Sequence, residues 1–291
     1  MPTPDFAQPY RSRSALTMRQ NLGRWPWQIR GLGVAGAAVA AAAVAACSRG
    51  AADWRQTEPA RPVAAQEAGY ARPPQLLVAA RQPDGGVVLS GRADPQDRVR
   101  LSAPAGEAYG ATADDNGRWT ISLPAAADVR LFGLSEVLAG RLVQSEGYIA
   151  LPPARGRAAL VLRAGVGAMA LGAAPARPRI AAIDCDAAGG VVISGLARPG
   201  STLHLSIDQG AGVDARVDGD GRYSIALGAA MRAGDHEVMV SAAGDSVRTR
   251  FAIGAPPAIT GVPFRGQRQA DRWRIDWITP GGGVQTTYVL D

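Results

Sequence analysis

The chain contains no lysine, so all 31 of its positively charged side chains, in a sequence of 291 residues, are arginines. This absence excludes a phosphate-loop lysine, a Schiff-base lysine and a Ser–Lys dyad. The only two cysteines and two histidines, at positions 47, 185, 204 and 236, do not have the spacing of a Cys/His zinc site. Aromatic residues make up only 5% of the chain, whereas 36 glycines and 21 prolines indicate many turns. We therefore expect no cofactor, no bound metal and no catalytic activity.

The length and hydrophobic content describe a folded protein with about two domains. Domains usually contain roughly 100–200 residues each. Hydrophobic residues account for 47% of the chain and charged residues for 19%. This balance allows a buried core and is not typical of a disordered chain.

A run of small apolar residues near the N-terminus predicts a secretory signal. Residues 31–46 contain no charge and follow five arginines: Arg11, Arg13, Arg19, Arg24 and Arg30. A positive flank before a short apolar run is typical of a signal peptide, and a transmembrane helix needs about 20 strongly apolar residues. Residues 1–46 are therefore predicted to be a signal peptide that starts at Met1 or at Met18.

The end of this run, Val44-Ala45-Ala46-Cys47, resembles the lipobox of bacterial lipoproteins. The resemblance implies that the Cys47 thiol is lipidated and that Cys47 becomes the mature N-terminus. An uncleaved signal anchor is the alternative. Ser48 then favours the outer membrane of the cell envelope, by analogy with that family. Residues 47–74 have no apolar periodicity and are predicted to be a flexible tether.

The basic character of the chain lies mostly in the predicted signal peptide. The net charge is +6, and residues 1–46 contribute +4 of it, from five arginines against Asp5. A nucleic-acid-binding face needs clustered basic side chains, and the remaining sequence shows no such cluster. We therefore expect no nucleic-acid partner.

An internal repeat dominates the remainder of the sequence. Residues 85–124 align without a gap with residues 189–228, at an offset of 104, and about 17 of 40 positions are identical. In each copy apolar and polar residues alternate as in half-buried strands. The dipeptides Asn116-Gly117 and Asp220-Gly221 favour tight hairpin turns. Short strands separated by such turns predict an antiparallel β-sandwich of about 100 residues for each copy.

The repeat also resembles bacterial Ig-like domains, in which a strand ending in Ser-Gly, a Pro-Gly turn and an Asp-Gly-Arg-(Trp/Tyr) segment recur. In the second copy these are Ser194-Gly195, Pro199-Gly200 and Asp220–Tyr223. The resemblance implies an all-β protein with two tandem Ig-like sandwiches. The predicted boundaries are 75–164 for the first domain, with an insertion at 125–163, 165–179 for a linker, 180–257 for the second domain and 258–291 for a C-terminal β-hairpin.

The C-terminal hairpin is the first candidate for a binding site. Trp273 and Trp277 alternate with charged residues, and Tyr288 follows on the returning strand. Aromatic side chains often anchor interfaces, so these three residues are predicted to bind a partner. The alternative is that the hairpin caps the second sandwich. The insertion at 125–163 is the second candidate.

One glycine motif resembles a dinucleotide-binding loop. Residues 165–170 match G-x-G-x-x-A, and Asp184 and Asp186 follow about 20 residues later. Nucleotide binding at this loop would need a helix after it, but Pro175 and Pro178 would end such a helix early. We interpret the match as coincidental and the segment as an inter-domain linker.

The remaining chemistry-bearing residues have structural explanations. The acidic segments 114–117 and 218–221 suit hairpin turns and lack the ligand spacing of a calcium loop. His204 is expected on a solvated strand face. His236 has no serine in a G-x-S-x-G context to activate. Cys185 is predicted to be a small buried hydrophobe rather than a thiol that pairs between molecules.

These observations predict a membrane-anchored, non-catalytic envelope lipoprotein that acts as a binding or scaffold module. Its expected partners are the membrane, through the N-terminal lipid, and an envelope protein or a glycan. One alternative is a surface adhesin or carbohydrate-binding module that uses Trp273 and Trp277. The other is an envelope enzyme with an unrecognised site, in which His236 or an acid would act.

Overall fold

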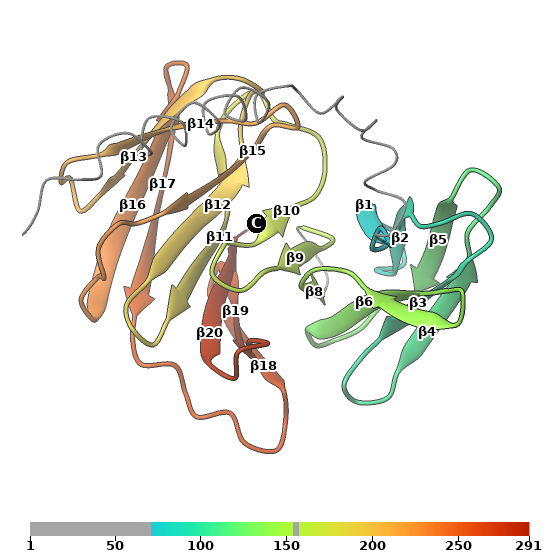
Figure 1. Cartoon of the computed structure of the whole chain (residues 1–291). Coiled ribbons are helices and arrows are strands. Elements are labelled where there is room, and N and C mark those ends of the chain that lie inside the picture. The colour runs from blue at the N-terminus through green and yellow to red at the C-terminus, as the bar shows by residue number, and fades with distance from the viewer. Residues whose placement is uncertain (1–70, 154–156, 291) are drawn as a thin grey trace, which may run out of the picture. The chain divides into compact units, whose positions relative to one another are not determined.

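The regular structure of the chain consists of β-strands. The computed structural model describes residues 71–153 and 157–290, which contain twenty strands and no helix (Figure 1). No part of these two ranges is therefore a helix long and apolar enough to cross a membrane. The predicted signal peptide, Cys47 and most of the predicted tether lie outside the described residues, all of which belong to one compact unit.

The first lobe, residues 71–171, is a sandwich of two antiparallel sheets. One sheet has the order β1-β2-β5, and the other has the order β10-β9-β8-β6-β3-β4, with β7 also paired to β6. The strands of the first sheet are β1 (Gln75–Arg81), β2 (Val87–Arg92) and β5 (Arg118–Leu123). Those of the second are β3 (Arg98–Ser102), β4 (Ala108–Thr112), β6 (Arg130–Leu138), β7 (Arg141–Gln144), β8 (Tyr148–Leu151), β9 (Leu160–Leu162) and β10 (Met169–Ala170).

The second lobe, residues 172–290, has the same two-layer construction. Its sheets have the orders β15-β12-β11-β20-β19-β18 and β14-β13-β16-β17. The first sheet contains β11 (Arg179–Asp186), β12 (Val191–Leu196), β15 (Arg222–Ala226), β18 (Phe264–Gln269), β19 (Arg272–Ile278) and β20 (Val284–Leu290). The second contains β13 (Thr202–Ile207), β14 (Val213–Arg216), β16 (Gly234–Ala242) and β17 (Asp245–Ile253).

The alternating pattern of the sequence builds these sandwiches. Along β5, Trp119, Ile121 and Leu123 are buried, while the residues between them are exposed. Successive side chains of a strand point to opposite faces, so this alternation places one face of β5 in the core. Burial of each such large apolar side chain contributes about 1.5–3 kcal/mol. The prediction of an all-β protein with two Ig-like sandwiches is confirmed.

The internal repeat extends further in the structure than in the alignment. β1 and β11 are equivalent at the offset of 104, and both contain a bulge, at Leu76/Val78 and at Ile180/Ala182. β6 and β16 are also equivalent at this offset. In both lobes the turn that follows is Ala-Gly with two positive φ angles, 48° and 78° in the first lobe and 52° and 88° in the second. Two positive φ angles define the type I′ hairpin turn.

This equivalence corrects the predicted insertion at 125–163. The two lobes differ only after β7. β17 is one continuous strand in the second lobe, whereas in the first lobe the equivalent strand is divided into β7 and β8. Arg130 pairs with Leu151, 21 residues away, whereas Gly234 pairs with Ile253, 19 residues away. The first lobe therefore holds two extra residues at this point. β9 and β10 then extend the same sheet.

The predicted C-terminal hairpin is also not a separate element. β20 pairs with β11, from Ala182 opposite Val289 to Asp186 opposite Gln285. β18, β19 and β20 therefore extend the β15-β12-β11 sheet of the second lobe (Figure 1). The predicted alternative, in which the hairpin belongs to the second sandwich, agrees with this arrangement.

The described residues contain three buried apolar clusters. Each sandwich has its own core, which contains for example Leu89 and Phe132 in the first lobe and Ile183 and Leu203 in the second. The third cluster joins strands of both lobes. Its members are Val129, Leu131, Ala150, Leu160, Leu162, Ala168, Ala170, Ala181, Ala182, Leu196, Trp273, Ile275, Trp277 and Val289. The two sandwiches therefore share an apolar interface.

Candidate functional site

The three aromatic residues predicted to bind a partner are buried. Trp273, Trp277 and Tyr288 are 9%, 0% and 4% exposed. The register of the hairpin also separates them, because Tyr288 lies opposite Arg274 rather than opposite either tryptophan. Both tryptophans belong to the shared cluster between the lobes, whereas Tyr288 belongs to the core of the second lobe. The three rings therefore do not form one exposed aromatic face.

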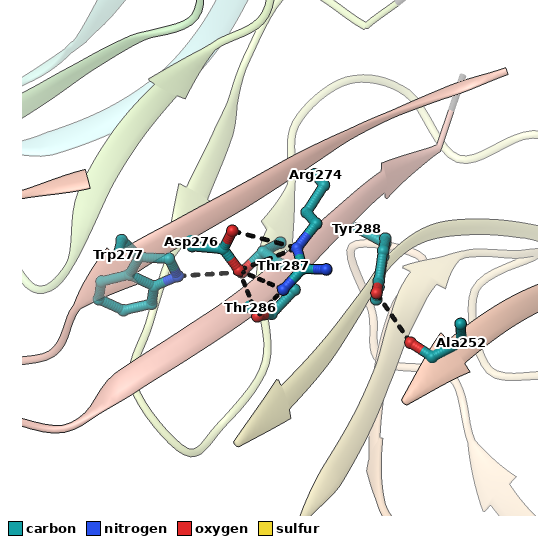
Figure 2. Close-up of polar contacts among 7 residues, drawn as sticks. All are labelled: Ala252, Arg274, Asp276, Trp277, Thr286, Thr287 and Tyr288. Carbon is teal, nitrogen blue, oxygen red and sulfur yellow. Dashed lines mark hydrogen bonds and ion pairs between the residues drawn. The ribbon is translucent and has the colours of Figure 1, made fainter. Parts of the chain in front are cut away.

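Trp277 and Tyr288 make hydrogen bonds and ring contacts within the protein. The Trp277 Nε1–H donates a hydrogen bond to Thr287 Oγ1 at 3.1 Å, and the Tyr148 ring lies edge-on, 5.8 Å away. The Tyr288 hydroxyl donates to the Ala252 carbonyl at 2.8 Å (Figure 2). Burial raises the pKa of Tyr288. Partner or glycan binding through these rings stays a prediction, without an exposed ring to support it.

A buried carboxylate, Asp184, joins the added strands to the repeat. Its Oδ1 atom accepts hydrogen bonds from Gln285 Nε2 at 2.9 Å and from Thr287 Oγ1. Its Oδ2 atom accepts one from the Ala168 N–H at 2.8 Å. Burial raises the pKa of Asp184, although these hydrogen bonds and Arg163 act in the opposite direction. Both carboxylate oxygens are occupied, so the contacts describe a structural tie.

A second acid, Asp276, has a similarly complete set of partners. Arg274 Nε donates to its two oxygens at 3.0 and 3.1 Å, and the Thr286 hydroxyl donates to Oδ1 (Figure 2). The Arg274 guanidinium carbon lies 5.9 Å from the centre of the Tyr288 ring. Buried charges are tolerated when they are paired and hydrogen-bonded. Arg274 and Asp276 both lie on β19, and the hydrogen bond from Thr286 connects them to β20.

The glycine motif at residues 165–170 forms a turn into β10. Gly165 and Gly167 have φ angles of 73° and 87°, and no helix follows within the described residues. The Ala168 N–H is bound to Asp184, and the Gly165 N–H donates to Gln285 Oε1 at 3.3 Å. These backbone donors therefore contact the second lobe. A phosphate could reach them only by displacing these side chains.

His236 is held by two acceptors. Its Nδ1 lies 2.7 Å from Asp208 Oδ2, and its Nε2 lies 2.9 Å from the Arg232 carbonyl oxygen. Burial lowers the pKa of His236, but hydrogen bonds to Asp208 and to the Arg232 carbonyl raise it, and the net direction is upward. Both ring nitrogens are engaged, so neither is placed to activate a nucleophile. His204 is exposed beside Asp214, at 2.7 Å, as predicted for a solvated strand residue.

The acidic segments form tight turns, but the prediction of hairpin turns is wrong. Residues 114–117 connect β4 to β5 and residues 218–221 connect β14 to β15, and in each case the two strands belong to different sheets. Asp114 Oδ1 accepts hydrogen bonds from the N–H groups of residues 116 and 118, and Asp218 Oδ1 from those of residues 220 and 222. Such bonds stabilise tight turns. Across the described ranges, no group of three or more His, Cys, Asp or Glu is arranged to hold a metal ion. Cys185 is buried, and burial raises the pKa of its thiol to about 12.

Glu136 is a buried acid that was not predicted. It is fully buried on β6, at the position of Val240 in the second lobe. Its Oε2 accepts a hydrogen bond from the Asp94 N–H at 3.1 Å, while Oε1 accepts none from the described residues. Burial raises the pKa of Glu136, the hydrogen bond from the Asp94 N–H lowers it, and the charges of Asp94 and Asp97 raise it; the net direction is upward. An alignment of the two copies carried past residue 124 would have shown an acid at a core position.

The strongest candidate binding site is an apolar groove beside β1. We call it the β1 groove, and its volume is about 360 Å³. Its apolar lining comes from five strands of the sandwich, β1, β6, β8, β9 and β10, and includes Leu76, Leu77, Leu134, Ile149, Val161 and Met169. One sheet ends at β1, whereas the facing sheet continues through β8, β9 and β10. The inner face of these added strands therefore lies beside the edge of β1 and lines the groove.

Comparison with known proteins identifies no relative from sequence: no family model and no curated protein matches the chain. Among solved structures, the chain is similar to the central fibronectin-III array of RIM-binding protein, with 16% identity and a TM-score of 0.27 over 74% of this chain and 88% of that one. It is also similar to the BSP domain of a biofilm associated protein, with 14% identity and a TM-score of 0.23. The latter similarity covers 64% of this chain and 30% of that one. The fold assignment rests on the strand pairing described above.

Proposed function

We propose that this protein is a membrane-anchored, non-catalytic lipoprotein of the cell envelope that binds a partner through its first lobe. The β1 groove carries the proposal. It combines an apolar lining from the first lobe with four charged residues: Glu146 and Arg163 of the first lobe, and Asp220 and Arg222 of the second. Binding sites are commonly concave and apolar, with a few polar groups that orient the ligand.

The polar groups elsewhere support a binding role rather than a catalytic one. Both carboxylate oxygens of Asp184 and of Asp276 accept hydrogen bonds from neighbouring groups, which for Asp184 include the Ala168 N–H, and both ring nitrogens of His236 are occupied. A general acid or base needs hydrogen-bond access to a substrate. The sandwiches supply a rigid support for a recognition surface.

Membrane attachment through Cys47 is tested by lipid labelling. A Cys47→Ser chain should lose incorporation of labelled palmitate and should leave the membrane fraction. Cys185→Ala is the matched control, because its side chain is buried, and this variant should keep both properties. Equal palmitate incorporation in the Cys47→Ser chain and the wild type would contradict the anchor.

Partner binding is tested by crosslinking in intact cells. The wild type should capture a defined partner, and Leu77→Glu should lose it, because this change places a charge in the β1 groove. Leu142→Glu is the control, since Leu142 is exposed on β7 and does not line the β1 groove. Capture that is unchanged by Leu77→Glu would place the binding site elsewhere. A catalytic turnover by the purified chain would contradict the non-catalytic assignment.

A further inference from the structure

The two lobes use equivalent edge strands differently. β11 pairs with β12 on one side and with β20 on the other. β1 is the equivalent strand of the first lobe, and within the described residues it pairs only with β2. A strand at the edge of a sheet presents a row of backbone N–H and C=O groups that can pair with another strand. The first lobe therefore has an open edge where the second lobe has a bound strand.

The backbone of the two edges has the same course. β11 meets β20 through residues 182–186, directly after its bulge. The equivalent residues of the first lobe are 78–82, and they follow a bulge at the equivalent position. A bulge redirects and twists the strand that contains it. Because both bulges are alike, the edge of β1 has the shape that accepts an antiparallel strand in the second lobe.

β20 also covers apolar side chains of the second lobe. Tyr288 and Leu290 pack in one cluster with Phe251 and Ile253 of β17. In the first lobe, Ile149 of β8 lies at this side of the sandwich and lines the β1 groove. A strand added to β1 would therefore cover the groove as β20 covers the edge of the second core.

The side chains of β1 are more exposed than the equivalent side chains of β11, as expected if only β11 is covered by a paired strand. Leu77 and Val78 are 43% and 51% exposed, whereas the equivalent Ala181 and Ala182 are fully buried. The segment 78–82 contains one charged residue, Arg81, whose side chain donates a hydrogen bond to the Pro152 carbonyl at 2.7 Å. The residues of β20 that pair with β11 are Gln285, Thr286, Thr287, Tyr288 and Val289, which are uncharged. β-Branched and aromatic side chains favour strands.

We propose that β1 binds an extended segment of another protein as an additional antiparallel strand. The segment is uncharged and rich in β-branched and aromatic residues, and its alternate side chains enter the β1 groove. Main-chain hydrogen bonds supply affinity in such complexes, and pockets for alternate side chains supply specificity. This inference rests on the proposed binding function and names the chemistry of its partner.

The test uses a peptide with the sequence of β20, VQTTYVL, as the probe. The full chain is purified in mild detergent, and binding of a fluorescently labelled peptide is followed by anisotropy. We expect saturable binding that Leu77→Lys/Val78→Lys weakens about tenfold or more, because lysines block strand pairing at a sheet edge. Leu142→Lys/Val213→Lys is the matched control, since these side chains are exposed on other strands, and it should bind as the wild type does.

A peptide with prolines, VQPTYPL, should not bind, because proline lacks the N–H group needed for pairing. Circular dichroism of each variant checks that the sandwiches remain folded. No saturable binding of VQTTYVL below roughly 1 mM, or equal binding by Leu77→Lys/Val78→Lys, would overturn the proposal.

Two further results separate this proposal from the broader binding function. Concentration-dependent dimerisation that Leu77→Lys/Val78→Lys abolishes would show that a second copy occupies the edge, and it would overturn the assignment to another protein. Crosslinking to a cellular partner that this variant leaves intact would preserve the binding function but refute strand addition at β1.

Discussion

Replacement of Asp184 by alanine tests whether this carboxylate ties the added strands and the linker to the second sandwich. The side chain is buried and accepts hydrogen bonds from the Ala168 N–H, Gln285 Nε2 and Thr287 Oγ1. Asp184→Ala leaves these three donors without their acceptor. An unsatisfied buried donor costs about 1–3 kcal/mol.

The expected loss follows from this geometry. Three buried donors lose their acceptor at about 1–3 kcal/mol each, so Asp184→Ala should lower the free energy of unfolding by about 3 kcal/mol or more. Asp184→Asn should cost less, because one carbonyl oxygen still accepts. The exposed Asp128 is the control, and Asp128→Ala should change stability by no more than about 0.5 kcal/mol.

The pH dependence has a defined sign. The pKa of Asp184 is raised above 3.8 in the folded protein, chiefly by burial. The folded state therefore binds this proton more tightly than the unfolded state does. The contribution to stability is greatest below the unfolded pKa and is lost as the pH rises through the folded pKa. The stability of the wild type relative to Asp184→Asn should thus decrease as the pH rises above about 4.

Urea denaturation followed by far-ultraviolet circular dichroism measures these differences. A loss smaller than about 1 kcal/mol for Asp184→Ala would refute the reasoning, because it would mean that the three donors find other partners or water. A relative stability that increases with pH would refute the direction assigned to the Asp184 pKa.

Three further predictions concern other buried or paired groups. The pKa of His236 is raised, so its contribution to stability is present below about pH 6.5 and is lost as the pH rises through the folded pKa. In thermal melts between pH 5.5 and 8.5, His236→Gln and Asp208→Asn should both remove this pH dependence. An increase with pH in the stability of the wild type relative to these variants would contradict the prediction. Trp277→Ala should lower the free energy of unfolding by about 3–5 kcal/mol, since the ring is fully buried, and a variant as stable as the wild type would show that the ring is not a core residue. In a Cys47→Ser chain, the Cys185 thiol should react with a maleimide at pH 8 only after denaturant is added, because its pKa is about 12 and it is buried; rapid labelling of the native chain would contradict this.

The local features of the fold were predictable because short-range patterns determine them. Alternating apolar residues predicted the strands, and Asn-Gly and Asp-Gly predicted the positions of turns at 116–117 and 220–221. The sequence did not show that these turns connect different sheets rather than the two strands of a hairpin. The gapless offset of 104 predicted two equivalent sandwiches, and their strands obey it from β1 and β11 to β6 and β16.

The candidate aromatic site shows the limit of this approach. Trp273 and Trp277 alternate with charged residues, so an aromatic face was expected, and Tyr288 was assigned to it. The face on which Tyr288 lies depends on the register of β19 and β20, and a shift of one residue moves a side chain to the other face. The sequence also does not state whether a hydrophobic face meets solvent or another part of the chain.

The strands, the positions of the turns, the repeat and the burial of Cys185 follow from the sequence, because neighbouring residues and a fixed offset carry that information. The position of β20 beside β11, where Thr287 binds Asp184 from 103 residues away, is known only from the folded structure. The same is true of β1, which within residues 71–153 and 157–290 pairs only with β2 and lies beside a groove. Both features depend on which strands meet at a sheet edge, and local periodicity does not specify that pairing.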